Sequence, residues 1–198
     1  MLTVKQLFWC NAFLGSNKKN WNNNMSIFVI GIKSDIYIIN LNYTLFLFLK
    51  ALNFLKCFIQ TKKRIIFYLP KLNNLSIFNF ILNISKWIFG MLTNVNALYN
   101  SKSKSNIYIK GFPSLIVIFH NKDYVSIINE CLHLDIPIIG FADTSQNPLY
   151  FDYPIPTNSN SSEFIYFYYK IIISYVKILL LKSQKEFFNS IIVKNKIK

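Results

Sequence analysis

The pattern of apolar and polar positions in residues 1–41 predicts a small structure that precedes the main domain. A short helix is expected over residues 3–13. Residues 15–25 form a polar, basic stretch without periodicity, which indicates a loop. Residues 28–32 and 36–40 are β-rich runs separated by three polar residues, a pattern typical of a β-hairpin.

Residues 42–182 have the pattern of an α/β core. Three short, continuously apolar runs have the composition of buried parallel strands: residues 64–69, 114–119 and 136–141. Helices are predicted over residues 42–60, over 123–134 with Asp123 as N-cap, and from residue 158 or 159 onward. Residues 71–84 are also helix-like, whereas prolines favour an extended segment over 148–156.

Strands alternating with helices predict the fold class. The expected fold is a three-layer α/β domain whose mainly parallel sheet is of the flavodoxin or Rossmann type, with the N-terminal hairpin as an extension. Residues 1–182 are expected to form this single domain, and residues 183–198 a basic C-terminal tail.

The net positive charge of the chain indicates what kind of partner it binds. The net charge is +14 over 198 residues, which indicates a polyanionic partner, either nucleic acid or anionic lipid. Nearly all the positive charge is lysine, with Arg64 as the only arginine, and the chain has 31 Ile and 24 Asn. Lysine, isoleucine and asparagine have A/T-rich codons. We therefore interpret this residue usage as the coding bias of an organellar genome.

Two apolar segments raise the alternative of a membrane protein. Residues 43–59 contain Lys50, Asn53 and Lys56, and residues 164–181 contain two lysines seven positions apart. A lysine near the middle of a spanning helix costs about 2.5–3.5 kcal/mol. Buried amphipathic helices of a packed domain are therefore favoured over stable membrane insertion.

The sequence contains no group of residues with the spacing of a catalytic or metal site. The three cysteines are widely spaced, so no zinc pattern or disulfide framework is expected. Asp143 and Thr144 end a buried strand, where α/β ligand sites usually lie, but the sequence offers no partner carboxylate, histidine or glycine-rich phosphate loop for them. We expect a structural role there, with no enzymatic activity, cofactor, metal or small-molecule substrate.

Residues 113–158 carry an ordered set of motifs. Pro113 precedes a predicted strand, and Glu130 lies in the helix that follows it. The remaining motif residues come after this helix: Ile136-Pro137, Asp143-Thr144, Asn147-Pro148, Asp152, Ile155-Pro156 and Asn158. Two earlier blocks agree in order, one at Gly15, Trp21-Asn22, Met25, Gly31 and residues 36–41, the other at Trp87 and residues 90–94. Together they resemble the universal small-subunit ribosomal protein uS2 family.

The chain departs from the family pattern at several positions. Lys19 and Asn20 replace two arginines, Phe13 and Ser16 replace two histidines, and the strand after Arg64 lacks the usual continuation. Only 18 residues separate Asn94 from Pro113, where bacterial members have a coiled-coil hairpin. That hairpin is expected to be reduced or absent.

The resemblance implies a structural constituent of the small ribosomal subunit, in contact with its rRNA and with neighbouring ribosomal proteins. With the codon bias and an N-terminus lacking the pattern of a signal or transit peptide, it favours a mitochondrial, organelle-encoded form. A basic peripheral membrane protein and a nucleotide-binding α/β protein remain alternatives. Lysines that neutralise phosphates and polar groups in loops give the predicted RNA-binding residues: Lys18, Lys19, Asn22, Asn24, Thr93, Asn94, Lys102 and Lys104. Trp21 is expected either to stack on a base or, preferably, to fold back onto the core.

Overall fold

Five short apolar strands form the main sheet of the fold. The computed structural model describes residues 2–70, 78–94, 112–120 and 124–196, with side chains up to Lys185. Within this part of the chain the sheet has the order β5-β4-β6-β7-β8, and all neighbouring strands are parallel. The strands are β4 (Ile65–Tyr68), β5 (Ile81–Ile84), β6 (Leu115–Ile118), β7 (Ile138–Ala142) and β8 (Tyr153–Pro156). This is the flavodoxin-like order, so the predicted fold class is confirmed.

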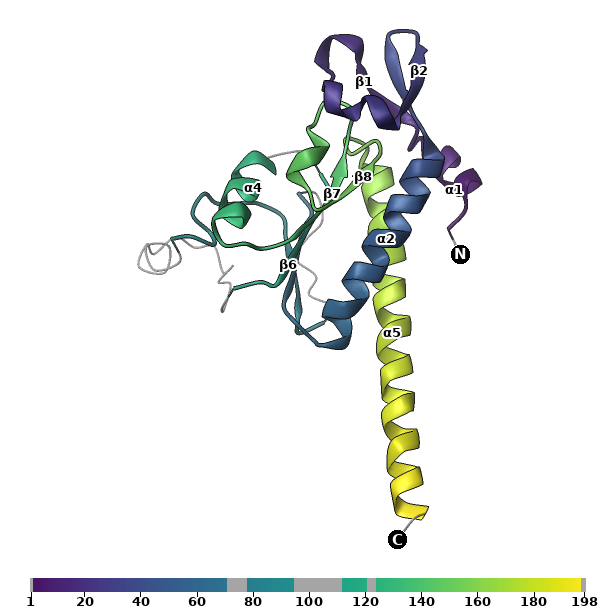
Figure 1. The fold of residues 1–198 in the computed structure, drawn as a ribbon, viewed down its shortest axis with the longest axis vertical. Coiled ribbons are helices and arrows are strands. Elements are labelled where there is room, and N and C mark those ends of the chain that lie inside the picture. The colour runs from purple at the N-terminus through teal and green to yellow at the C-terminus, as the bar shows by residue number, and fades with distance from the viewer. Residues whose placement is uncertain (1, 71–77, 95–111, 121–123, 197–198) are drawn as a thin grey trace.

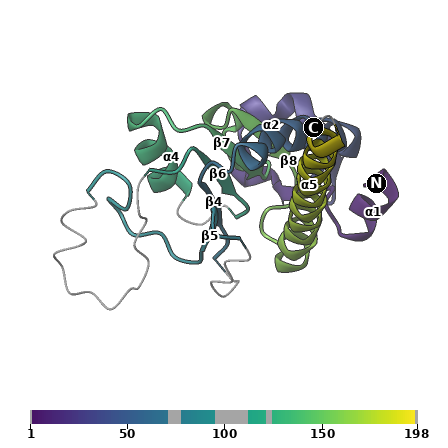
Figure 2. The same cartoon turned by 90° about the horizontal axis from the view of Figure 1, so that it is seen from below.

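The sheet is covered on both faces, which makes three layers (Figures 1 and 2). Helices α2 (Leu41–Gln60) and α5 (Ser162–Lys196) lie on one face, and α4 (Tyr124–His133) lies on the other. Because side chains alternate along a strand, each strand supplies both cores. In β4, for example, Ile65 and Phe67 join the core beneath α2 and α5, while Ile66 and Tyr68 join the core beneath α4.

Helix α2 shows why its apolar sequence does not require a membrane. Its buried residues recur every three or four positions and pack against β8 and α5: Leu41, Thr44, Phe48, Ala51, Leu55 and Ile59. Lys50 and Asn53 lie on the exposed face. The Thr44 hydroxyl donates to the Pro156 carbonyl of β8 at 2.6 Å, which fixes the helix to the sheet edge. Leu41–Gln60 and Ser162–Lys185 are long and apolar enough to span a membrane by length and composition, a weak criterion that core helices also meet.

The N-terminal residues form a second, antiparallel sheet above the carboxyl end of the main one (Figure 1). Its order is β1-β3-β2, from β1 (Leu14–Asn17), β2 (Val29–Lys33) and β3 (Ile36–Ile39). The β2–β3 pair confirms the predicted hairpin, whose turn places Ser34 and Asp35 at φ of 49° and 61°. Helix α1 (Val4–Trp9) precedes this sheet, so the helix expected within residues 3–13 is confirmed, although it is shorter.

Three sequence predictions need correction. The stretch 15–25 is not a structureless loop, because it contains most of β1 and short 3-10 helices at Lys18–Asn20 and Asn23–Phe28. Residues 81–84 form strand β5 instead of a helix, because pairing with β4 outweighs local preference. Residues 148–156 are not extended throughout: Pro148–Tyr150 is a 3-10 helix, and β8 then becomes an edge strand that tolerates its prolines.

Helix α5 runs through the predicted start of the C-terminal tail. It is 35 residues long, continues to Lys196 and projects well beyond the sheet (Figure 1). Its first half supplies core residues as far as Val176, whereas residues 181–185 are exposed. The expected boundary at residue 183 therefore falls inside a helix. The Asp123 N-cap expected for α4 lies outside the described residues.

Candidate nucleic-acid interface

The basic segment 17–25 is held in defined turns on the surface. The side chains of Asn17 and Asn22 accept hydrogen bonds from Lys19 N and Asn24 N, and so cap the two 3-10 helices. Lys18 and Lys19 are exposed, and Lys18 N donates to the carbonyl of Asp35 in the hairpin turn at 2.8 Å. Two ammonium groups are thus presented to solvent on a backbone fixed at both ends.

Thr144, at the carboxyl end of β7, anchors this segment to the main sheet. Its Oγ1 atom lies 2.6 Å from both Ser16 N and Ser16 Oγ, and its carbonyl accepts from Asn22 N at 2.8 Å. Gly15 lies so close that a Cβ there would be 2.6 Å from Thr144 Cγ2. The chain's own N-terminal segment therefore covers the carboxyl end of β7.

The buried carboxylate of Asp143 holds Thr144 in place. It is 1% exposed, and its Oδ1 accepts from Thr144 N at 2.7 Å while Oδ2 accepts from Asn160 Nδ2 at 3.0 Å. Burial raises the pKa of Asp143 to about 6, and hydrogen bonds from Thr144 and Ser16 offset part of that shift. These contacts agree with the structural role expected for the pair.

Trp21, Asn22 and Asn24 of the same segment all make contacts within the fold. Trp21 stacks on Tyr37 of β3, with ring centroids 4.7 Å apart, so it folds back onto the N-terminal sheet as preferred above. Asn22 is half-buried, and its side-chain oxygen accepts a hydrogen bond from Asn24 N. Asn24 is exposed, and its Nδ2 donates to Asn147 Oδ1 at 3.1 Å. Both amides therefore take part in local hydrogen bonds, and Asn24 is the more exposed of the two.

Thr93 and Asn94 end a turn that is held by a buried carboxylate. Glu130 of α4 is 3% exposed, and its two oxygens accept from four N–H groups of this turn. The donors and distances are Trp87 Nε1 at 2.9 Å, Gly90 N at 2.9 Å, Leu92 N at 2.8 Å and Thr93 N at 3.4 Å. Gly90 has a φ of +83°, which a residue with a side chain rarely adopts.

This geometry leaves none of these backbone N–H groups available to bind a phosphate. Those at Gly90, Leu92 and Thr93 already bond to Glu130, and Asn94 N donates to the Gly90 carbonyl at 2.8 Å. The side chains of Thr93 and Asn94 are nevertheless exposed. Any RNA contact here would use these side chains rather than the backbone. Lys102 and Lys104 lie outside the described residues.

The basic segment and the 87–94 turn share one core. Met25, at the end of the segment, is fully buried and belongs to the same cluster as Trp87, Met91 and Leu92. The six predicted residues that the structure describes are therefore carried by two segments joined through that core. Sequence reasoning matched Glu130 and Thr144 to family positions but not to these roles, because contacts 38 to 128 positions apart leave no local pattern.

Comparison with known proteins identifies the family. The family model for ribosomal protein S2 matches residues 7–110 and 101–177, which together cover most of the chain. The chain belongs to the ribosomal protein S2 family. Among its relatives in this family, the small ribosomal subunit protein uS2m of Acanthamoeba castellanii is 34% identical over 96% of the chain.

Bacterial relatives in the S2 family are more distant. The uS2 proteins of Ehrlichia ruminantium and Karelsulcia muelleri are 29% and 26% identical over 86% and 89% of the chain. The chain spans 63% of the length of the Acanthamoeba protein, 74% of the Ehrlichia protein and 97% of the Karelsulcia protein. Family membership confirms the resemblance found in the sequence.

The Glu130 contacts predict a large effect of a small substitution. Glu130→Gln replaces one acceptor oxygen with an amide that faces backbone donors, so we expect the free energy of unfolding to fall by about 2–4 kcal/mol. Urea denaturation of the full chain measures this. Asn129→Gln, at the exposed neighbouring position, is the control and should change stability little. Equal effects of the two substitutions would contradict the assigned role.

The close approach at Gly15 gives a matched pair of glycine substitutions. Gly15→Ala forces Thr144 to move and should destabilise the chain by about 1–3 kcal/mol. Gly31→Ala, in the same antiparallel sheet, has no atom within 4 Å of the added Cβ. Thermal unfolding should therefore show a lower midpoint only for Gly15→Ala. A lower midpoint for both would mean that the contact with Thr144 is unimportant.

The raised pKa of Asp143 predicts a pH-dependent contribution to stability. Between about pH 4 and pH 6 the folded chain holds a proton that the unfolded chain has released, so this contribution falls as pH rises and is lost by about pH 7. Asp143→Asn cannot titrate. Its unfolding free energy relative to the unsubstituted chain should rise by on the order of 3 kcal/mol from pH 4 to pH 7. Parallel pH profiles for the two chains would refute the prediction.

Proposed function

We propose that this S2-family protein is a structural constituent of the small subunit of a mitochondrial ribosome, where it binds rRNA and neighbouring ribosomal proteins without catalysing a reaction. The observation that carries the proposal is the exposed Lys18–Lys19 pair, fixed to a rigid α/β body by Ser16, Asn22 and Thr144. Fixed lysines bind phosphates with little ordering cost, and counterion release drives the association. The net charge of +14 supports the same partner class.

Two features support the mitochondrial assignment. The Acanthamoeba relative is named as a mitochondrial protein, and the residue usage of the chain is that of A/T-rich coding. Bacterial relatives match over a similar share of the chain, so the family alone does not decide the compartment. Sedimentation of mitochondrial lysate is the direct experiment. The chain should migrate with the small subunit at moderate salt, and its absence from that fraction would overturn the proposal.

Neither alternative function has comparable support. A nucleotide-binding α/β protein needs a glycine-rich phosphate loop after its first strand, but the sequence that follows β4, residues 70–74, contains no glycine. For membrane association, one face of α2 packs on β8 and α5, and its exposed face carries Lys50 and Asn53 beside apolar Phe46 and Leu49. We therefore propose no small-molecule substrate, no cofactor and no stable membrane insertion.

The lysine pair predicts a specific change in RNA affinity. The double substitution Lys18→Gln with Lys19→Gln should weaken binding of the full chain to small-subunit rRNA. It should also reduce the slope of log affinity against log salt concentration by about 1–2. Filter binding at several salt concentrations measures both quantities.

The control for that experiment carries the same loss of charge. Lys50→Gln with Lys177→Gln removes two exposed lysines from α2 and α5. A smaller effect of this control would support a defined contact at Lys18 and Lys19. The same effect from both pairs would mean that only total charge matters.

A further inference from the structure

A second candidate site lies at the opposite edge of the main sheet, where its strands begin. Arg64 directly precedes β4, Phe80 precedes β5 and Ser114 precedes β6. Ile65 pairs with both Ile81 and Leu115, so the three preceding residues are aligned side by side. Hydrogen bonds at 2.8 Å from Ser114 N to Arg64 O and from Ile65 N to Phe80 O hold this alignment.

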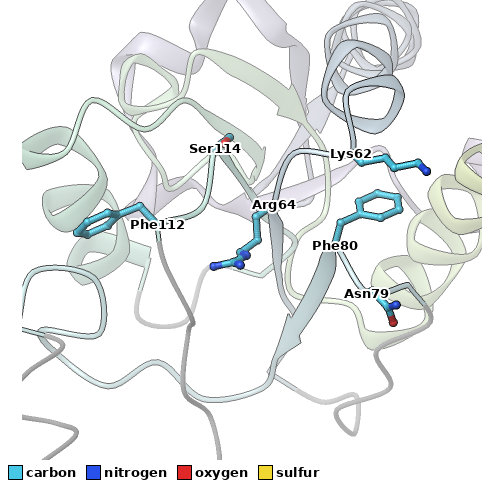
Figure 3. Close-up of a pocket in the computed structure, with 6 residues that line it drawn as sticks. All are labelled: Lys62, Arg64, Asn79, Phe80, Phe112 and Ser114. Carbon is cyan, nitrogen blue, oxygen red and sulfur yellow. The ribbon is translucent and has the colours of Figure 1, made fainter.

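These residues surround a pocket of about 600 Å³. Figure 3 shows the Arg64 side chain between Phe112 on one side and Phe80 on the other, with Lys62 at the pocket's rim. The lining is completed by Asn79 and Ser114. The volume is within the range of sites that hold one small ligand or one segment of a polymer.

The chemistry of the lining is basic and aromatic. Among the described residues, those that line the pocket include two cations and no carboxylate. In the part of the chain that the structure describes, the Arg64 guanidinium has no hydrogen-bond or ion-pair partner. Phe112 is 64% exposed. One exposed aromatic ring is ordinary, but a ring beside the chain's only arginine matches what a nucleotide requires.

Lys62, at the pocket's rim, has an uncommon backbone conformation. It follows the C-cap of α2 with a φ of 51°, a position at which helices usually have glycine. A cation at a helix C-terminus is favourable, which accounts for a lysine near this end. It does not account for a lysine at the strained position itself, since glycine there would avoid the conformational cost. Because four other described non-glycine residues also have positive φ, the strain by itself assigns no role, and Lys62 contributes a second cation at the pocket.

We propose that this pocket binds a single-stranded segment of RNA, with Arg64 and Lys62 contacting phosphates and Phe112 stacking on a base. The proposal rests on the RNA-binding function proposed above but concerns a separate site. The chain would then contact RNA at both edges of its sheet, through Lys18 and Lys19 at one edge and through Arg64 at the other.

A single-stranded segment fits the pocket better than a free mononucleotide. Ligand sites for mononucleotides in open α/β sheets lie at the carboxyl edge and use glycine-rich turns, whereas this pocket lies at the amino edge. An exposed ring with cations beside it is typical of surfaces on which successive bases of a strand stack.

The test uses the full chain and a short fluorescein-labelled oligouridylate, with fluorescence anisotropy as the readout. Arg64→Gln and Phe112→Leu should each weaken binding about five- to a hundredfold. A labelled RNA duplex should lose much less affinity with Phe112→Leu, since its bases are not available for stacking. Lys62→Gly should weaken oligouridylate binding while raising the thermal unfolding midpoint, two opposite changes that a purely structural role does not produce.

Three controls separate the outcomes. Lys177→Gln removes one exposed positive charge from α5, and an effect equal to that of Arg64→Gln would overturn the proposal. Competition by adenosine monophosphate would indicate a mononucleotide pocket and would also overturn it. Loss of binding with the Lys18 and Lys19 substitutions but not with those at Arg64 and Phe112 would refute this site while leaving the proposed function intact. Failure of the unsubstituted chain to bind rRNA would refute the proposed function itself.

Discussion

The hydroxyl and carbonyl of Thr144 bond the N-terminal segment directly to the end of a main-sheet strand. Thr144 ends the buried strand β7, and it bonds to Ser16 and Asn22 on either side of the basic turn. Asp143 holds the Thr144 backbone in place, and the missing side chain at Gly15 allows the close approach. The position of every residue in the Lys18–Lys19 turn relative to the main domain depends on this joint.

On the other face of the sheet, the buried carboxylate of Glu130 holds the 87–94 turn. A chain leaving a parallel strand must turn back, and its turn exposes backbone N–H groups that are costly to bury unbonded. One carboxylate on α4 satisfies three of these groups and the Trp87 indole together. Buried acidic residues, which in an enzyme would suggest acid–base chemistry, here bind the protein's own backbone.

The regularly spaced parts of the fold could be predicted from sequence, because burial imposes a local pattern. Strands β4, β6 and β7 are continuous apolar runs, and α2 has its apolar residues at helical spacing. Strand β5 could not be found in this way, since its sequence ILNI is short and follows an Asn-rich stretch. Neither could β1, which depends on pairing with a strand about twenty positions later. For the candidate site, the exposed lysines were recognisable by charge. The pocket at Arg64 was not, because it forms only when three strand starts are aligned.

The length of α5 means that only part of this helix is stabilised by packing within the chain itself. At about 1.5 Å per residue, its 35 residues extend roughly 50 Å, which far exceeds the length of the strands that support its first half. Helical stability in proteins comes mainly from packing of one face, so the projecting half gains little from the domain itself. Amide hydrogen exchange of the free protein should therefore be slow near Tyr168 and accelerate toward Lys185, and a partner that packs on the projecting half would slow exchange along the whole helix. Stable ordering of that half would then follow binding of the partner and would not be part of the folding of the isolated chain.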